Sequence, residues 1–329
     1  MEDELPDHVR DYKLETTFPR KREIVHIYND TNAPPSSQRR FEHWKSDKRP
    51  IGRGGQGRVF LQTCTSGGRY YTHRAVKIIP LQDGGGRRRY IRELETIVKF
   101  SHDKYSKYFV KSLGWYEKED SLCIAMEYVP TGDLQTYLRE HPALPEDNSR
   151  QIISQVLQGL EIMHREGFAH RDIKPQNILI YQYPMPTEPG SWWVKLSDFG
   201  ISKRLEAATS SASTVIGTEE YMAPELLSHL SDINYPAADM WALGVMTFWI
   251  LTKSHMFPDR WDVFQYAANP ERLFPRGSLG DVSLEGQAFI HALMRPKPDE
   301  RPDCNTASHH AWVQSWMPNA PMIPDIHNE

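Results

Sequence analysis

The sequence predicts an α+β fold in two lobes, a small sheet-rich N-terminal lobe and a larger, mostly helical C-terminal lobe. Short runs rich in β-branched and aromatic residues occupy residues 59–61, 74–79 and 122–129, as is typical of strands. Beyond Gly132 the apolar residues instead recur at intervals of three and four, which is the period of an amphipathic helix. This change of period places the lobe boundary at about residues 128 and 129.

Four segments have the apolar periodicity of helices. One lies in the small lobe and carries five apolar residues on one face: Tyr90, Ile91, Leu94, Ile97 and Val98. Three lie in the large lobe, at residues 152–163, 242–251 and 287–294. Two further segments are expected to be surface loops. They are the glycine- and arginine-rich residues 83–89 and the proline-containing residues 181–193, which separate two expected short strands.

The domain boundaries follow from the same patterns. Residues 1–44 show no strong periodicity and include a loop-like Asn-Ala-Pro-Pro-Ser-Ser cluster, so we expect a partly ordered extension. It either joins the domain to a larger parent protein or lays a strand on the small lobe. Residues 45–316 are expected to form one domain with lobes of about 45–128 and 129–316, followed by a tail at 317–329. A ligand is expected in the crevice between the lobes.

Composition excludes several classes of protein. Hydrophobic residues make up 39% of the 329 positions and charged residues 25%, as in ordinary globular proteins. A net charge of −4 gives no reason to expect a nucleic-acid or membrane partner. The three cysteines are scattered, which argues against a metal cage or a disulfide framework. The N-terminus has no apolar run of the kind found in a secretory signal. The longest apolar stretch, 240–251, is too short to span a bilayer. We therefore expect a soluble cytoplasmic, or alternatively nuclear, protein.

The most informative motif is His-Arg-Asp-Ile-Lys-Pro-Gln-Asn at residues 170–177, followed by Asp-Phe-Gly at 198–200. It supplies a proton acceptor, a cation for phosphate and two oxygen ligands for magnesium, in the order that phosphoryl transfer from ATP requires. Either string alone is weak, because short strings recur by chance. The chain also has a glycine-rich loop at 52–57, Ala-Val-Lys at 75–77 and Ala-Pro-Glu at 223–225.

Together these motifs resemble the eukaryotic protein kinase family, from about Phe41 to about Trp316. Lys174 and Thr218 match its serine/threonine branch, and the insert ending in Trp192-Trp193 is similar to kinases of filamentous fungi. The resemblance implies the bilobal protein kinase fold. It also implies transfer of the γ-phosphoryl group of ATP to serine or threonine hydroxyls of protein substrates.

The resemblance also implies roles for four catalytic residues. Asp172 accepts or orients the proton of the attacking hydroxyl, while Lys174 neutralises the transferring phosphoryl group. Lys77 holds the α- and β-phosphates and pairs with a glutamate on the small-lobe helix. Glu93 is the best match for that partner, and Glu95 competes with it. A solvent-exposed strand lysine is the alternative for Lys77.

ATP and Mg²⁺ are the implied cofactors. Glycines bring backbone amides close to the polyphosphate, Val59 covers adenine, and Met126 limits access behind it. Asn177 and Asp198 offer the hard oxygen ligands that Mg²⁺ prefers. Asp133 meets either the ribose hydroxyls or a basic substrate residue, and a solvated surface carboxylate is equally consistent with it. The expected cofactor-binding residues are Ile51, Gly52, Gly54, Gly57, Val59, Ala75, Lys77, Met126, Glu127, Val129, Asp133, Asn177 and Asp198.

Other matches are architectural. Glu225 and Arg301 are expected to form a buried ion pair. Asp239 is expected to accept hydrogen bonds from backbone N–H groups of residues 170–177, which we call the catalytic loop. His170 and Phe199 are expected to make apolar contacts.

Regulation by phosphorylation is expected in the segment after Asp198. It is rich in hydroxyl groups, at Thr209, Ser210, Ser211, Ser213 and Thr214. A phosphate there could be held by Arg171 and Lys203, which would order the segment. An upstream activating kinase would then be a partner. The alternative is a polar loop that is never modified.

Three other functions remain open. A pseudokinase would keep the fold and regulate a partner, but such proteins usually have degraded motifs. Lys174 and Thr218 disfavour a tyrosine or dual-specificity kinase. Ala-Pro-Glu at 223–225 disfavours a small-molecule kinase, because it belongs to enzymes that dock peptides.

Overall fold

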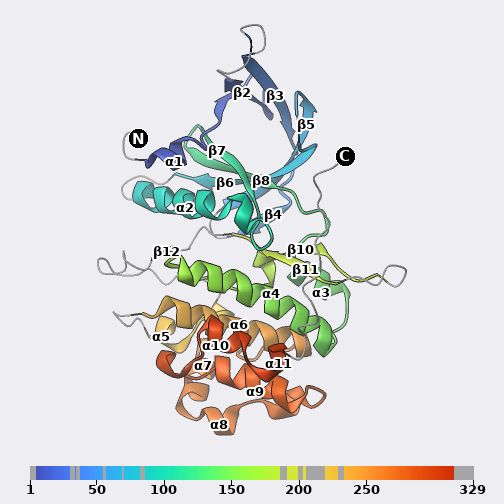
Figure 1. Cartoon of the computed structure of the whole chain (residues 1–329), viewed down its shortest axis with the longest axis vertical. Coiled ribbons are helices and arrows are strands. Elements are labelled where there is room, and N and C mark those ends of the chain that lie inside the picture. Colours follow the sequence, from blue (N-terminus) through green and yellow to red (C-terminus); the bar gives the residue numbers. More distant parts are fainter. Residues whose placement is uncertain are drawn as a thin grey trace. The chain divides into compact units, whose positions relative to one another are not determined.

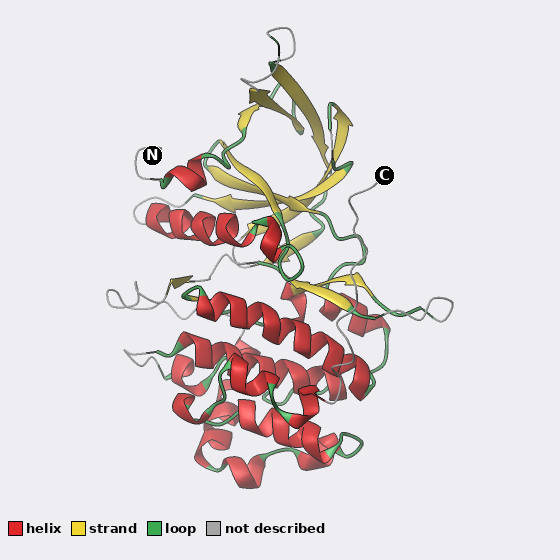
Figure 2. Cartoon of the chain, in the orientation of Figure 1, coloured by secondary structure: helices red, strands yellow, loops and turns green. Residues whose placement is uncertain are grey.

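The two predicted halves of the chain are present in the computed structural model as two units, Met1–Pro130 and Thr131–Glu329. Strands dominate the N-terminal unit and helices the C-terminal unit, so the predicted α+β class is confirmed (Figure 2). The structure describes residues 5–29, 34, 38–54, 57–68, 70–81, 86–185, 191–198, 203–204, 219–228 and 233–314. Each unit is considered by itself below.

The N-terminal unit is built on one eight-stranded sheet with the order β1-β2-β3-β5-β6-β8-β7, in which β4 pairs with β5 (Figure 1). Its strands are β1 (Glu15–Thr17), β2 (Glu23–Asn29), β3 (Arg39–Ser46), β4 (Gly52–Gly54), β5 (Gly57–Ser66), β6 (His73–Pro80), β7 (Ser112–Lys118) and β8 (Ser121–Glu127). Its helices are α1 (Asp7–Arg10), α2 (Gly86–Phe100) and the short 3-10 helix η3 (Asp103–Tyr105). The predicted strands at 59–61 and 74–79 therefore lie within β5 and β6, whereas the one predicted at 122–129 corresponds to β8, which ends two residues earlier.

The helix α2 contains the predicted apolar face, with Leu94, Ile97 and Val98 buried. It begins at Gly86, so the last four residues of the expected loop at 83–89 are helical. The sequence did not indicate this helical start, because three glycines precede the arginines, and glycine usually ends helical periodicity.

Residues 7–46 form four elements, α1, β1, β2 and β3. The alternative that this extension lays a strand on the small lobe is therefore the one observed, although the sequence did not show the individual strands. The period of two is obscured because two buried positions in these strands are polar, His26 and Glu42. The segment just before β1 also reaches β7: Leu14 N–H donates to Trp115 O (2.7 Å) and Trp115 N–H donates to Tyr12 O (3.0 Å). The two ends of the strand order thus meet, and the sheet closes around its own core.

Gly114 of β7 shows how close this contact is. Its φ is +115°, and a β-carbon there would lie 2.8 Å from Leu14 Cγ. Only glycine combines this backbone conformation with so close an approach. The chain before residue 45 is therefore packed directly against the sheet.

A buried arginine, Arg74 of β6, lies inside this sheet with only 1% of its surface exposed. Its guanidinium donates to Gln62 Oε1 (2.7 and 3.0 Å) and to His26 Nε2 (2.7 Å), and it stacks 4.0 Å from the Trp44 ring centroid. Because arginine only donates, His26 Nε2 accepts, and His26 Nδ1–H donates to Thr16 Oγ1 (2.8 Å). Burial, together with the Arg74 charge, lowers the pKa of His26 to about 3.

The neutral His26 thus accepts a hydrogen bond from the Arg74 guanidinium, and the Trp44 ring stacks on it. Without such partners, this cation would be costly to bury. Both come from strands that precede residue 45, and Arg74 lies on the same strand as Ala75 and Lys77. We infer that the N-terminal strands stabilise β6.

The C-terminal unit is mostly helical. Its α-helices are α3 (Leu134–Glu140), α4 (Glu146–Arg165), α5 (Pro224–Leu227), α6 (Tyr235–Thr252), α7 (Arg260–Ala268), α8 (Pro270–Leu273), α9 (Leu284–Leu293), α10 (Cys304–Ser308) and α11 (Ala311–Gln314). Its strands are β9 (Phe168–Ala169), β10 (Ile178–Gln182), β11 (Trp193–Leu196) and β12 (Lys203–Arg204), and its 3-10 helices are η4 (Pro175–Asn177), η6 (Glu219–Tyr221), η7 (Arg276–Leu279) and η8 (Pro298–Glu300). The predicted helices at 152–163, 242–251 and 287–294 correspond to α4, α6 and α9.

The helix α6 is the centre of this unit. It is apolar all round and buried from Ala237 to Ile250, and α4 and α9 pack against it (Figure 1). A helix of this kind belongs in a core. In the part of the chain that the structure describes, no helix is long and apolar enough to cross a membrane.

The N-terminal strands can be tested with Trp44→Ala. The substitution should lower the free energy of unfolding by about 3–5 kcal/mol, because it removes a buried indole and uncovers Arg74. Urea denaturation would measure this. Phe41→Ala on the same strand is the matched control: Phe41 is 46% exposed, and its loss should change stability by about 0.5 kcal/mol or less. Equal effects of the two substitutions would show that the N-terminal strands do not support the sheet.

Candidate active site

One face of the N-terminal sheet gathers most of the residues predicted to bind nucleotide. The strand register pairs Gly52 with Val59, Val59 with Lys77, and Ala75 with Met126. Directly opposed residues, and residues two apart on a strand, share a face of a sheet. These five residues therefore lie on one face, whereas the neighbouring residue Val76 belongs to the core on the other.

The predicted ion pair of Lys77 is present in this unit. Its Nζ lies 3.5 Å from Glu93 Oε1 of α2, and the side chains are 8% and 4% exposed. Between the two glutamates that the sequence left in competition, the geometry therefore selects Glu93 over Glu95. Since both groups are buried, each reduces the cost of burying the other.

The glycine-rich segment forms the hairpin of β4 and β5, in which Gly54 pairs with Gly57. A β-carbon at Gly57 would lie 2.3 Å from the carbonyl oxygen of Ile78. Glycine is therefore required at this position by the close approach of β6, in addition to any approach of phosphate. Ile51, just before the hairpin, is 50% exposed.

The end of β8 contains the other predicted adenine contacts. The N–H of Glu127 donates to Lys111 O (3.0 Å), and the carboxylate of Glu127 accepts the N–H of Lys111 (2.7 Å). Val129, which follows, is 7% exposed. The backbone here is therefore fixed by its own strand pairing.

The catalytic loop of the C-terminal unit brings three predicted residues together. Asp172 Oδ2 lies 2.6 Å from Lys174 Nζ. The side-chain amide of Asn177 donates to the same carboxylate oxygen (3.0 Å) and to the backbone oxygen of Asp172 (2.7 Å). The Asp172 side chain is 8% exposed and that of Lys174 19%. A carboxylate is thus held in place between a cation and an amide.

The hairpin of β10 and β11 places Asp198 near this loop. Ile178 pairs with Leu196, and Ser197 donates to the backbone oxygen of Asn177 through its N–H (2.9 Å) and its hydroxyl (3.1 Å). Asp198 is the next residue. Phe199 and Gly200 lie outside the described residues.

Backbone strain is found in this region. Arg171 has φ +70° and Asp198 has φ +60°, in the left-handed region that non-glycine residues rarely adopt. Strain of this kind costs about 1–3 kcal/mol per residue and persists only where the surroundings hold it. Arg171 is held by stacking on Tyr235 (4.1 Å) and by the hydrogen bond from its N–H to Asp239 Oδ1 (2.7 Å).

Asp239 of α6 accepts hydrogen bonds from backbone N–H groups of the catalytic loop, as predicted. Its Oδ2 accepts the N–H of His170 (2.8 Å) and its Oδ1 that of Arg171. His170, expected to make apolar contacts, is also fixed by hydrogen bonds: its Nδ1 accepts the N–H of Asp172 (3.3 Å) and its Nε2 bonds Ser197 O (3.1 Å). Sequence reasoning missed this second role of His170 and the role of Ser197.

Asp133 has a local structural role that the sequence reasoning also missed. Its carboxylate caps α3, accepting the N–H (2.8 Å) and the hydroxyl (2.9 Å) of Thr136. The signal was available, since aspartate three residues before threonine at a helix start is typical of a cap.

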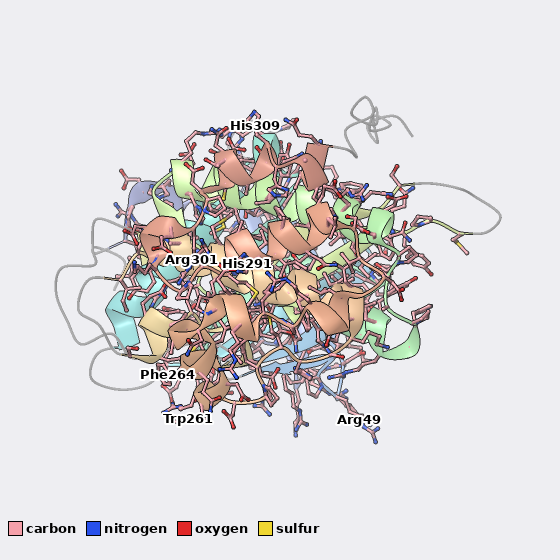
Figure 3. All side chains as sticks on the ribbon, turned by 90° about the horizontal axis from the view of Figure 1, so that it is seen from below. Arg49, Trp261, Phe264, His291, Arg301 and His309 are labelled. Atoms are coloured by element: carbon pink, nitrogen blue, oxygen red, sulfur yellow. The ribbon has the colours of Figure 1, made fainter. Side chains whose placement is uncertain are left out.

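The predicted pair of Glu225 and Arg301 is confirmed. The guanidinium donates to both carboxylate oxygens (2.6 and 2.8 Å), and Arg301 lies among the helices of the C-terminal unit (Figure 3). Its remaining N–H groups reach the backbone oxygens of Ala237, Arg295 and Pro296. All five donors of a fully buried guanidinium are therefore satisfied.

Several predicted residues lie outside the part of the chain that the structure describes. They are Thr209, Ser210, Ser211, Ser213, Thr214 and Thr218. Glu219 and Glu220, which follow, are exposed and pair with Arg260 and His255 at 3.3 and 3.4 Å.

The residues present fit a magnesium ion that is shared with phosphate groups. Because the amide nitrogen of Asn177 is turned toward Asp172, its oxygen is the atom able to ligate, and Asp198 adds a carboxylate. Mg²⁺ is usually held by one or two such protein ligands together with substrate phosphates. Among the residues described, no group of three or more His, Cys, Asp or Glu suited to a metal occurs.

Comparisons with known proteins agree with the geometry. Residues 46–313 match the protein kinase domain family. The chain is 32% identical over 236 residues to serine/threonine-protein kinase RAD53 of Saccharomyces cerevisiae, covering 68% of this chain and 27% of RAD53. It is 27% identical over 294 residues to calcium/calmodulin-dependent protein kinase cmkA of Emericella nidulans, covering 88% of this chain and 67% of cmkA.

A solved structure of Rad53 residues 1–466 in complex with AMP-PNP superimposes with a TM-score of 0.64 at 29% identity, covering 82% of this chain and 65% of that one. This likeness confirms the predicted fold. The chain spans about a quarter of the length of RAD53.

The anchoring ion pair can be tested with Glu225→Gln. The substitution should lower the free energy of unfolding by about 3–5 kcal/mol, because it leaves the Arg301 charge buried without its partner. Glu219→Gln is the matched control: it breaks an exposed pair with Arg260 and should cost about 0–1 kcal/mol. A loss at Glu225 no larger than the loss at Glu219, measured by chemical denaturation, would contradict the anchoring role.

Proposed function

We propose that this chain, which belongs to the protein kinase family, transfers the γ-phosphoryl group of ATP to serine or threonine hydroxyls of protein substrates. The observation that carries the proposal is the Asp172 carboxylate, which has both Lys174 and Asn177 within hydrogen-bonding distance. The relatives support it, because RAD53 is a serine/threonine kinase and Rad53 binds AMP-PNP.

In this proposal the C-terminal unit performs the transfer chemistry. Asp172 orients the attacking hydroxyl and takes its proton, and Lys174 offsets charge on the transferring phosphoryl group. The side-chain amide of Asn177 holds Asp172 in place through one hydrogen bond to its carboxylate and one to its backbone oxygen. The protein thus contributes positioning and electrostatic stabilisation, which account for most catalysis of phosphoryl transfer.

Magnesium is part of the proposal, with Asn177 and Asp198 as the residues that would hold it. When bound, the ion supplies positive charge to the phosphate oxygens. The strained backbone of Asp198 is consistent with a carboxylate positioned for such a ligand.

The N-terminal unit is assigned the binding of the nucleotide. Val59, Ala75 and Met126 lie on the sheet face that also carries Lys77. This arrangement supports contacts of the apolar residues with adenine and of the lysine with the α- and β-phosphates. The intact pair of Lys77 and Glu93 also favours an active enzyme over a pseudokinase.

The assignment of catalytic residues is tested by substitution. Asp172→Asn should lower kcat by about 10²- to 10⁴-fold, because the proton acceptor is lost. Asp198→Ala should abolish transfer by removing the magnesium ligand. Labelled ATP, magnesium and a peptide library would measure activity and specificity together. The exposed Asp281→Asn is the control, with unchanged turnover expected. Retained turnover in Asp198→Ala, with unaltered thermal stability, would refute the metal assignment.

We further propose that phosphorylation after Asp198 activates the enzyme. The hydroxyl-rich residues are Thr209, Ser210, Ser211, Ser213 and Thr214. A phosphate carries close to two negative charges, and Arg171 and Lys203 could bind it. An upstream kinase would add it.

Mass spectrometry of active and phosphatase-treated protein tests this regulation. Phosphate on at least one of these hydroxyls should accompany activity, and its removal should lower kcat. Substituting all five residues by alanine should reproduce the low activity. Full activity without phosphate in this segment would rule the proposal out.

A further inference from the structure

A cysteine, a histidine and an aspartate form a hydrogen-bonded row inside the C-terminal unit. Cys304 Sγ of α10 lies 3.3 Å from His164 Nδ1 of α4. His164 Nε2 lies 2.9 Å from Asp239 Oδ2 of α6. The same Asp239 carboxylate holds the backbone N–H groups of His170 and Arg171. The row therefore begins at a thiol and ends at the catalytic loop.

The direction of each hydrogen bond follows from the groups involved. A carboxylate only accepts, so His164 Nε2 carries the hydrogen that Asp239 receives. When the ring is neutral, Nδ1 is then an acceptor. Its neighbour is Cys304 Sγ, which can donate the thiol hydrogen to it.

The thiol is suited to donate because it remains protonated. Cys304 is 3% exposed, and burial, together with the nearby carboxylates of Asp239, Glu161 and Asp303, raises its pKa. Met240 Sδ, at 3.5 Å, is the competing acceptor. A thioether is a much weaker acceptor than an imidazole nitrogen. The thiol of Cys304 therefore donates its hydrogen bond to His164 Nδ1.

The same three residue types form nucleophilic sites in other proteins, where a histidine activates a thiolate. That role does not fit this cluster. A reactive cysteine is partly exposed and has a lowered pKa, whereas Cys304 is buried and its pKa is raised. The cluster therefore has a structural role: its hydrogen bonds position neighbouring residues of the protein.

We propose that Cys304 is a positioning residue for phosphoryl transfer, acting through His164 and Asp239 on the catalytic loop. This inference rests on the proposed kinase function. The thiol hydrogen bond to Nδ1 fixes the ring orientation of His164, whose tautomer is set by Asp239. The fixed Nε2–H then supplies one of the three donors that hold the buried Asp239 carboxylate in place.

The position of Asp239 matters because Arg171 is strained. Its φ of +70° is maintained by the hydrogen bond from its N–H to Asp239 Oδ1. Asp172, the proposed proton acceptor, is the next residue in the chain. A shift of Asp239 would therefore reach the reacting group through one peptide bond.

Two substitutions at Cys304 separate hydrogen bonding from packing. Cys304→Ser keeps a donor, whereas Cys304→Ala removes it. In the full chain, ¹⁵N NMR should show His164 with protonated Nε2 and accepting Nδ1 in the wild type and in Cys304→Ser. In Cys304→Ala the Nδ1 signal should shift, because Nδ1 loses the hydrogen bond from the thiol.

Kinetics with ATP, magnesium and a phosphorylatable peptide provide the second measurement. Cys304→Ala should lower kcat by about 2- to 10-fold, the range expected for one lost hydrogen bond, while KM for ATP changes less than about twofold. Cys304→Ser should restore kcat. Cys123→Ala, which removes another buried thiol from the N-terminal unit, is the control and should leave the His164 signals unchanged.

Unchanged His164 signals and unchanged kcat in Cys304→Ala would overturn the inference. A loss of kcat that Cys304→Ser does not restore would also overturn it, because packing alone would then explain the effect. Failure of the wild-type chain to transfer phosphate would instead refute the proposed function, and the ¹⁵N signals would still decide whether Cys304 fixes His164.

Discussion

The buried carboxylate of Asp239 is the interaction on which the candidate site depends most. It is 1% exposed, and a charge so far from water is tolerated only when donors replace the lost hydration. Three N–H groups do so, two from the backbone of the catalytic loop and one from His164. Because α6 is buried on all sides, this carboxylate ties the loop to the central core helix of the C-terminal unit.

The N-terminal unit uses the same principle with the opposite charge. The Arg74 guanidinium is buried inside the sheet and satisfied by Gln62 and His26, with Trp44 stacked on it. Both cases combine an expensive buried charge with a full set of partners, which makes one arrangement of the neighbouring elements much more favourable than others. In each unit the proposed functional residues are adjacent to such a network, Lys77 on the strand of Arg74 and Asp172 beside Arg171.

Much of the fold could be predicted from the sequence, because local patterns report local structure. The helix α4 has clear apolar periodicity, α6 contains the longest apolar run, and the strands β5, β6 and β8 have the composition of strands. The strands β2 and β3 could not be predicted, because their buried positions include His26 and Glu42. A buried polar residue looks like a surface residue until its partner is known, and that partner lies on another strand.

The sequence by itself determined which chemical groups are available and in what order, since the motifs around Asp172 and Asp198 consist of neighbouring residues. Only the tertiary structure decided which groups meet. It selected Glu93 rather than Glu95 for Lys77, and it joined Cys304 to His164 across 140 positions. The physical reason is that periodicity acts over a few residues, whereas the partner of a buried donor or charge is set by how distant elements pack.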